Sequence, residues 1–140
     1  MSECLTFEYQ VPGDDFTRAG EASSSVKNKL KMMGVDSGAI RRVAIAMYEG
    51  EINMVIHAGG GAIKVMVTDD NIRIILADTG PGIPDVEKAM QLGYSTAPEE
   101  VRSLGFGAGM GLPNMKKFSD NMQIDTEVGV GTTVTMDIHL

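Results

Sequence analysis

The sequence contains little cysteine, no tryptophan and few basic side chains. Among its 140 residues are one cysteine and 12 Lys and Arg against 19 Asp and Glu, for a formal net charge of −7. Cys4 has no second cysteine for a disulfide and no companions at metal-ligand spacing, so we give it no role. The acidic balance disfavours nucleic acid and anionic membrane surfaces as partners, because both bind through clustered basic residues.

Long apolar runs are also missing. No stretch approaches the roughly 18 apolar residues that a membrane span needs, and the N-terminus lacks the basic and apolar regions of a signal peptide. We therefore expect a cytoplasmic protein without a membrane partner. With 43% apolar and 22% charged residues, the composition is that of a globular protein, and the length suits one domain over residues 1–140.

The spacing of apolar residues predicts helices early in the chain and strand pairs late. Asp14 or Asp15 would cap the first helix, Gly34 would end it, and Pro113 would fall in the first turn of the last helix. The expected elements are a strand at 4–11, helices at 16–33, 37–58 and 85–91, a loop at 94–104, a helix ending at 118, and hairpins at 62–77 and 123–139. This order predicts an α+β fold, a two-layer sandwich with helices packed on one face of a mixed β-sheet.

The first group of candidate functional residues lies on the middle helix. Glu49, Asn53 and His57 are spaced by four, which places them in succession along one helical face. The amide oxygen of Asn53 suits Mg²⁺, and Glu49 could accept a proton from a hydroxyl or water. A polar row is also what the solvated face of a helix looks like, so this stripe alone does not decide between a site and a surface.

The second group directly follows an apolar strand, in the segment Asp78-Thr79-Gly80-Pro81-Gly82-Ile83-Pro84. A carboxylate at a strand end can accept a hydrogen bond from an exocyclic amine, and Gly82 has no side chain to keep a planar base away. These features suit adenine. An ordinary turn uses the same residue types, so the segment by itself favours neither reading.

The third group is the glycine-rich run Gly105-Phe106-Gly107-Ala108-Gly109-Met110-Gly111-Leu112 ahead of a helix. Glycine at every second position lets the backbone turn several N–H groups toward a ligand, and the following helix presents its positive end to an anion. The run lacks the Lys-Ser/Thr of a P-loop, and Leu112 breaks the dinucleotide-binding pattern. A phosphate site explains the alternation with apolar residues better than a flexible hinge does.

In this order, the three groups resemble the N-box, G1-box and G2-box of the GHKL superfamily, which includes histidine kinases, gyrase and MutL. The resemblance covers residues 43–133 and implies the Bergerat ATP-binding fold, with ATP and Mg²⁺ bound. It implies Asn53 as the Mg²⁺ ligand. The implied nucleotide-binding residues are Asn53, Asp78, Gly80, Gly82, Gly105, Gly107, Gly109, Gly111, Leu112 and Thr132.

Within the superfamily, the chain most resembles the small anti-sigma-factor and stressosome switch kinases, through the segments 78–86, 90–96 and 109–113. By that resemblance Glu49 is the base that activates the acceptor hydroxyl, and Arg102 contacts the γ-phosphate. His57 is either a site residue or a structural one. A complete histidine kinase is excluded, because the chain has no helix with a phosphoacceptor histidine and no sensor.

The resemblance implies a serine/threonine protein kinase that transfers the γ-phosphate of ATP to a STAS-type antagonist protein. The alternative is a nucleotide-gated binding module that sequesters a sigma factor or activates a phosphatase without significant phosphotransfer. A plain ATPase or a scaffold without nucleotide is a third reading. A homodimer is compatible with all three.

Overall fold

The computed structural model describes residues 4–13, 18–83, 86, 90 and 111–140. The elements are β1 (Leu5–Pro12), α1 (Glu21–Met32), α2 (Ser37–His57), β2 (Gly60–Val67), β3 (Asn71–Asp78), α5 (Gly111–Phe118), β4 (Asn121–Glu127) and β5 (Gly131–His139). The expected hairpins and the second helix are confirmed to within a few residues. Apart from Val86 and Met90, the expected helix at 85–91 and the loop at 94–104 lie outside the described residues.

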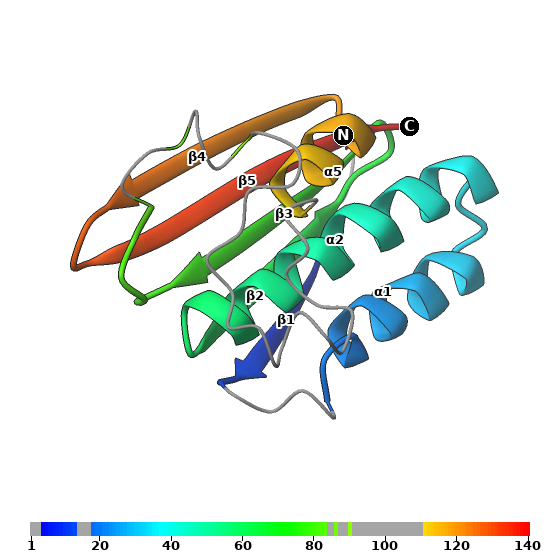
Figure 1. The fold of residues 1–140 in the computed structure, drawn as a ribbon. Coiled ribbons are helices and arrows are strands. Elements are labelled where there is room, and N and C mark those ends of the chain that lie inside the picture. The colour runs from blue at the N-terminus through cyan, green and yellow to red at the C-terminus, as the bar shows by residue number, and fades with distance from the viewer. Residues whose placement is uncertain (1–3, 14–17, 84–85, 87–89, 91–110) are drawn as a thin grey trace.

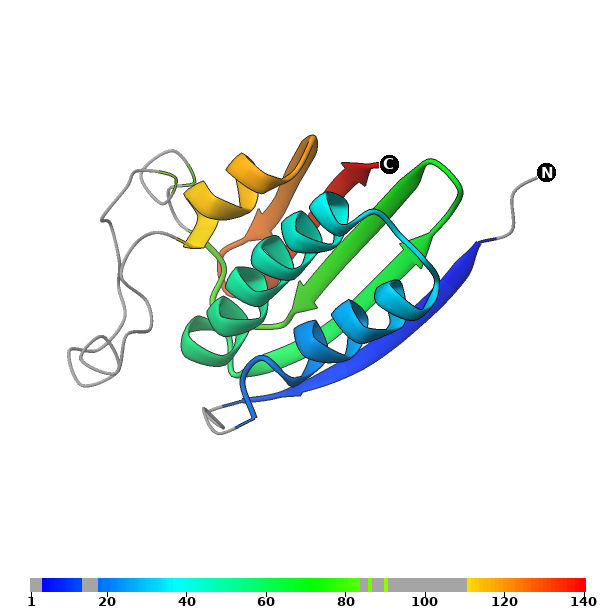
Figure 2. The same cartoon turned by 90° about the vertical axis from the view of Figure 1, so that its right-hand side faces the viewer.

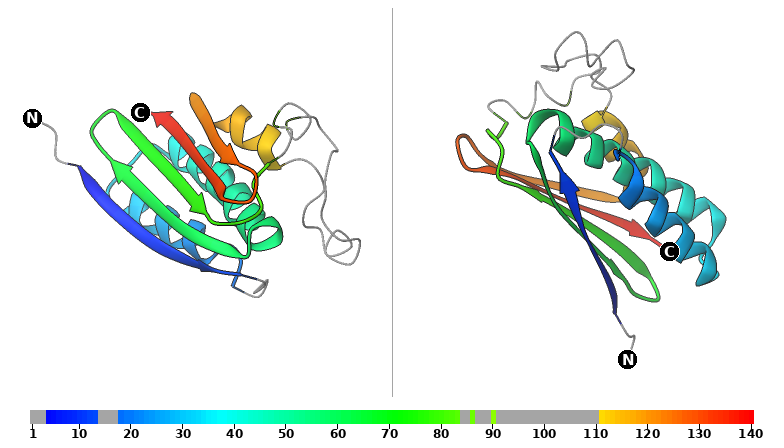
Figure 3. Two further views of the ribbon diagram at one scale, coloured as in Figure 1. Left: turned by 90° about the vertical axis from the view of Figure 1, so that its left-hand side faces the viewer. Right: turned by 90° about the horizontal axis from the view of Figure 1, so that it is seen from below.

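The molecule has two layers, which are seen edge-on in the right-hand view of Figure 3. Five strands form one sheet in the order β1-β2-β3-β5-β4. Helices α1, α2 and α5 cover one face of it, and α2 runs between the other two (Figure 2). This arrangement confirms the α+β two-layer sandwich that the sequence predicts.

The sheet differs from the prediction in strand direction. It was expected to be mixed, but every pairing between the described strands is antiparallel. The β2–β3 and β4–β5 pairs are hairpins, which reverse the chain direction by construction. Between β1 and β2 the chain crosses the sheet twice, in α1 and then in α2, so β2 returns opposite to β1 (Figure 1).

The hydrophobic core lies between the helices and the inward-facing side of the sheet. Alternate strand residues point inward, as in β2, where Ile63 and Val65 are buried and Lys64 is exposed. Helix α2 contributes one apolar side to this core, with Val43 and Met47 fully buried. Because these side chains hold α2 on the sheet, its opposite side is left to carry polar groups.

Helix α1 begins later than the sequence predicts, at Glu21 rather than Phe16. Gly20 precedes it with a φ of 97°, a left-handed conformation that ends any continuous helix from upstream. Gly20 is the N-cap residue, and because glycine has no side chain it cannot supply a side-chain cap. The expected cap at Asp14 or Asp15 lies outside the described residues.

The cap of α1 comes from another helix. The buried carboxylate of Glu51 on α2 accepts hydrogen bonds from the backbone N–H groups of Gly20 (2.9 Å), Ala22 (3.3 Å) and Ser23 (3.0 Å), and from the Ser23 hydroxyl (2.7 Å). A helix N-terminus leaves its first N–H groups without partners and carries partial positive charge, so a carboxylate satisfies both. Local sequence patterns predict caps within a few residues of a helix, so they could not indicate a cap supplied by α2.

Helix α2 begins and ends as predicted. The Asp36 carboxylate accepts a hydrogen bond from the Ala39 N–H at 3.2 Å, and Gly59 adopts a φ of 69° just beyond the helix. Although α2 is 21 residues long, none of the described helices is long and apolar enough to cross a membrane.

Candidate functional site

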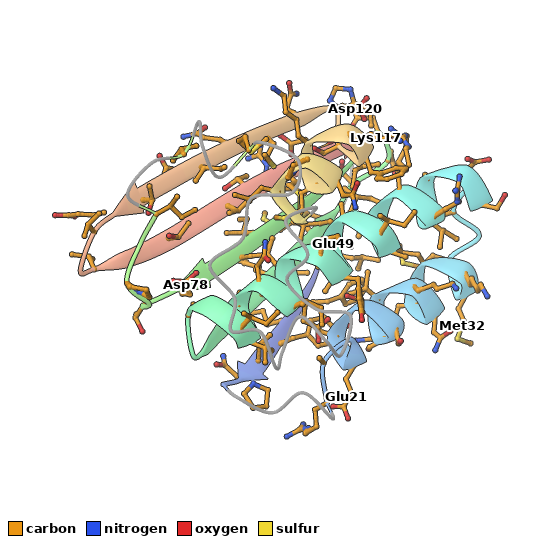
Figure 4. All side chains as sticks on the ribbon, in the orientation of Figure 1. Glu21, Met32, Glu49, Asp78, Lys117 and Asp120 are labelled. Atoms are coloured by element: carbon orange, nitrogen blue, oxygen red, sulfur yellow. The ribbon has the colours of Figure 1, made fainter. Side chains whose placement is uncertain are left out.

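Glu49 lies on α2, the central helix of the helical layer (Figure 4), and Asn53 lies about one turn further along the same helix. Both side chains are half-buried. Burial raises the pKa of Glu49 above the ordinary glutamate value, and a hydrogen bond with the Asn114 side chain of α5 partly opposes that shift. A carboxylate with a raised pKa holds a proton more strongly once it has accepted one, which is the property required of a general base.

Helix α5 begins against Asn53. A Cβ atom added to Gly111 would lie 2.8 Å from Nδ2 and 3.0 Å from Oδ1 of Asn53, so any side chain at this position would displace the Asn53 amide. Asn53 Nδ2 also lies 3.9 Å from the sulfur of Met115, one turn further along α5. The N-terminal end of α5, which favours anions, is therefore adjacent to the predicted Mg²⁺ ligand.

Asp78, at the end of β3, organises the second predicted segment. One of its carboxylate oxygens accepts hydrogen bonds from the N–H groups of Gly80 (2.9 Å) and Thr132 (3.2 Å). Thr132 is buried, and its hydroxyl lies 2.9 Å from that of Thr126 on β4. Asp78 and Thr132 thus lie side by side on paired strands, as their proposed common role at adenine requires.

Gly82 has a structural reason to be glycine in addition to the predicted one. Its φ is 81°, and an added Cβ atom would lie 2.6 Å from the carbonyl oxygen of Glu127. Around it, the Ile83 N–H donates to the Thr126 hydroxyl at 2.8 Å, and the Gly129 N–H donates to the Pro81 carbonyl at 2.9 Å. The segment after β3 is therefore held against the β4–β5 turn.

The two segments meet the same helix. A Cβ atom added to Gly80 would lie 2.6 Å from the Cα atom of Ala58, the residue that follows α2. Gly111 contacts Asn53, five residues earlier, which is about 7.5 Å along a helix axis. The last turns of α2 therefore contact both the loop after Asp78 and the start of α5, which brings these two segments to the same end of the helix.

A magnesium ion bound beside Asn53 would take most of its ligands from the nucleotide and from water. The described residues contain no group of three or more His, Cys, Asp or Glu side chains that could hold a metal ion. Mg²⁺ commonly binds through one or two protein oxygens together with substrate phosphates. Asn53, beside the start of α5, fits the role of such a single protein ligand.

Several predicted site residues are not described by the structure. Arg102, Gly105, Gly107, Gly109 and the side chain of His57 lie outside the described part of the chain, and their roles remain predictions. Leu112 is described, and it packs against the hydrophobic core.

Sequence reasoning missed two contributors to this region, Asn114 and Glu51. No local signal marks Asn114 as a partner of Glu49, because the contact joins two helices distant in the sequence. Glu51 did carry a signal. Two positions after Glu49, it lies on a different face of α2, where a charged residue needs buried partners.

Comparison with known proteins agrees with this geometry. Residues 38–140, well over half of the chain, match the family described as histidine kinase-, DNA gyrase B- and HSP90-like ATPases. The chain belongs to this GHKL ATPase family. The matched range contains α2, the Asp78 loop and α5, so the chain carries an ATP-binding domain of the GHKL type.

The relatives of this GHKL chain include kinases and anti-sigma factors by name. It is 32% identical over 112 residues to the serine/threonine-protein kinase RsbT of Bacillus subtilis, covering 77% of this chain and 78% of the relative. It is 34% identical to the anti-sigma F factor of Geobacillus kaustophilus, covering 97% and 90% of the two chains. These matches confirm the predicted resemblance.

A solved structure shares the fold. A Mycobacterium tuberculosis chain containing RsbU and RsbW domains superposes with a TM-score of 0.63 at 17% identity, over 97% of this chain and 32% of that one. At this identity the likeness supports the fold alone.

Proposed function

We propose that this GHKL chain is a serine/threonine protein kinase that transfers the γ-phosphate of ATP to a STAS-type antagonist protein. The observation that carries the proposal is the position of Glu49. It lies one turn from Asn53, beside the start of α5, and its pKa is raised by burial. ATP binding alone needs no proton acceptor at this place, whereas phosphoryl transfer to a hydroxyl or to water does. The relative named a serine/threonine-protein kinase favours the hydroxyl.

The chemistry assigns each described residue a task. Asp78 would bind the exocyclic amine of adenine, and the N-terminus of α5 with Asn53 would hold the phosphates. Glu49 would accept the proton of the acceptor hydroxyl as its oxygen bonds to the γ-phosphorus. The bond from that phosphorus to the β–γ bridging oxygen breaks, and ADP carries away the electron pair. Mg²⁺, held by Asn53 and the phosphates, would neutralise charge that develops on the phosphate oxygens.

The test is a labelling assay. The purified chain is incubated with Mg²⁺ and γ-labelled ATP against a panel of STAS-domain proteins, and labelled Ser or Thr is identified by mass spectrometry. Glu49→Gln should abolish labelling while ATP affinity, measured by calorimetry, stays within about twofold. Glu8→Gln, an exposed change on β1, serves as the matched control. Labelling that survives Glu49→Gln would overturn the assignment of the base.

A second function is favoured by the names of the relatives, because several are anti-sigma F factors. In this alternative the domain binds a sigma factor or a phosphatase only when nucleotide is bound, without significant phosphotransfer. A partner complex that forms with ATP, dissociates without it and yields no phosphoprotein would favour binding over catalysis.

A further inference from the structure

A groove of about 1000 Å³ lies between α1 and α2. The two helices run antiparallel, joined by a short connection at residues 33–36. The lining of the groove includes Gly20, Lys27 and Met32 from α1 and its N-cap, and Ile45, Tyr48 and Glu49 from α2. Glu49, the proposed base, is therefore shared between this groove and the α5 side of α2, where Asn114 contacts it.

We propose that this groove binds the segment of the acceptor protein that carries the Ser or Thr, a step that rests on the proposed kinase function. Transfer of a phosphoryl group requires the attacking and leaving oxygens to lie roughly in line, on opposite sides of the phosphorus. The phosphates would lie toward Asn53 and α5. The acceptor hydroxyl must then approach Glu49 from another direction, and the groove provides one.

The walls of the groove indicate the chemistry of the occupant. Two large apolar side chains along the groove are exposed, Met32 (91%) and Tyr48 (37%), and a partner that covered them would gain apolar contact area. Lys27 of α1 lines the groove and is exposed, on a chain whose net charge is −7. The occupant is therefore a segment with an apolar anchor and acidic residues.

The arrangement of residues along α1 fixes the direction in which the occupant would lie in the groove. Glu21 and Met32 lie at opposite ends of the helix (Figure 4), about 17 Å apart at 1.5 Å per residue. Glu51, which caps α1, lies on α2 two residues beyond Glu49, so the base is near the Glu21 end. The acceptor hydroxyl would thus lie at the acidic end of the groove, and the apolar and acidic residues of the occupant at the Met32 and lysine end.

The wall nearest Glu49 is built to keep its position. The Glu51 carboxylate holds the first turn of α1 through its four hydrogen bonds. The Tyr48 ring packs against Gly20, where an added Cβ atom would lie 3.4 Å from the ring.

The two lysines of the groove differ in their partners. Lys29 donates to the Tyr9 hydroxyl at 3.0 Å and lies over the Phe7 ring, so its charge is already engaged by β1. Lys27, which lines the groove and is exposed, remains available for an acidic partner.

The test uses the STAS-domain protein that the wild-type chain labels. Met32→Ser and Lys27→Glu should each raise the KM for that protein roughly tenfold, because anchor residues dominate such interfaces. The KM for ATP should not change. Leu140→Ser, also an exposed apolar residue, and Lys64→Glu, on the sheet face that carries no described helix (Figure 3), are the matched controls. The effect of Lys27→Glu should shrink in 0.5 M salt, where surface charges are screened.

The outcomes distinguish a failure of the groove from a failure of the kinase function on which it rests. An unchanged KM for the STAS protein in both variants would overturn the groove while leaving the kinase in place. If no STAS protein is labelled by the wild-type chain, the kinase function and the groove fall together. Both altered side chains are exposed, so circular dichroism should show unchanged melting temperatures. If the control variants raise the KM for the STAS protein as much as the groove variants do, the groove would also be refuted.

Discussion

Replacing Glu51 with alanine should destabilise the protein far more than any other single change of an acidic residue on α2. The carboxylate is 2% exposed and accepts four hydrogen bonds of 2.7 to 3.3 Å from the first turn of α1. A hydrogen bond to a charged group contributes roughly 1.5–3 kcal/mol net, although neighbouring bonds are not additive. Removing the carboxylate leaves buried N–H donors without an acceptor, which costs about 1–3 kcal/mol for each group, and we expect a total loss of roughly 3–5 kcal/mol.

The magnitude translates into a measurable melting temperature. At about 2.1 cal/mol/K per residue, unfolding 140 residues has an entropy of roughly 0.3 kcal/mol/K, so a loss of 4 kcal/mol lowers the Tm by about 14 °C. Glu51→Gln keeps the shape and one acceptor oxygen but turns an amide donor toward other donors, so it should lose about 2 kcal/mol.

Thermal and urea unfolding followed by circular dichroism would measure these changes. Glu8→Ala on β1 is the control, because an exposed substitution should stay within about 0.5 kcal/mol of wild type. A loss of less than about 1 kcal/mol in Glu51→Ala would refute the view that this carboxylate fixes the first turn of α1.

Two further predictions concern the site. Glu49 must be ionised to accept a proton, so activity should fall as the pH drops through its pKa, which burial raises above 4.5. Asn114→Ala removes the hydrogen bond that opposes this rise, and the acid limb of the kcat/KM profile should move to higher pH; an unmoved limb would contradict the base role. Gly111→Ala places a methyl group 2.8 Å from Nδ2 of Asn53, so ATP affinity in Mg²⁺ should fall roughly tenfold or more. Calorimetry in EDTA is the control, and an equal loss in both conditions would argue against Asn53 as the Mg²⁺ ligand.

Much of the fold could be predicted because it depends on local patterns. The alternation in residues 62–68 and 72–77 reflects one buried and one open face, and the structure places Ile63, Val65 and Ile74 inside. Gly34 and Gly59 end helices through left-handed backbone conformations, as expected. The direction of strand pairing could not be predicted, because it depends on how often the chain crosses the sheet between paired strands.

The site was predictable in part for the same reason. The spacing of Glu49 and Asn53 places them on neighbouring turns of any helix, whatever surrounds it. The contacts of Gly80 with Ala58 and of Gly111 with Asn53 join segments 22 and 58 residues apart in the sequence. No pattern within one segment encodes contacts between segments so far apart in the sequence. The resemblance to the GHKL motifs indicated instead that these segments come together.

The sequence by itself determined the periodic elements, their glycine ends and the order of the polar groups along the chain, since each follows from backbone geometry within a few residues. Only the tertiary structure decided that Glu51 caps α1, that Asn114 contacts Glu49, and that a groove reaches the proposed base. Those features arise where separate helices pack on a common sheet, and a buried charge takes its partners from whatever that packing brings within hydrogen-bond distance.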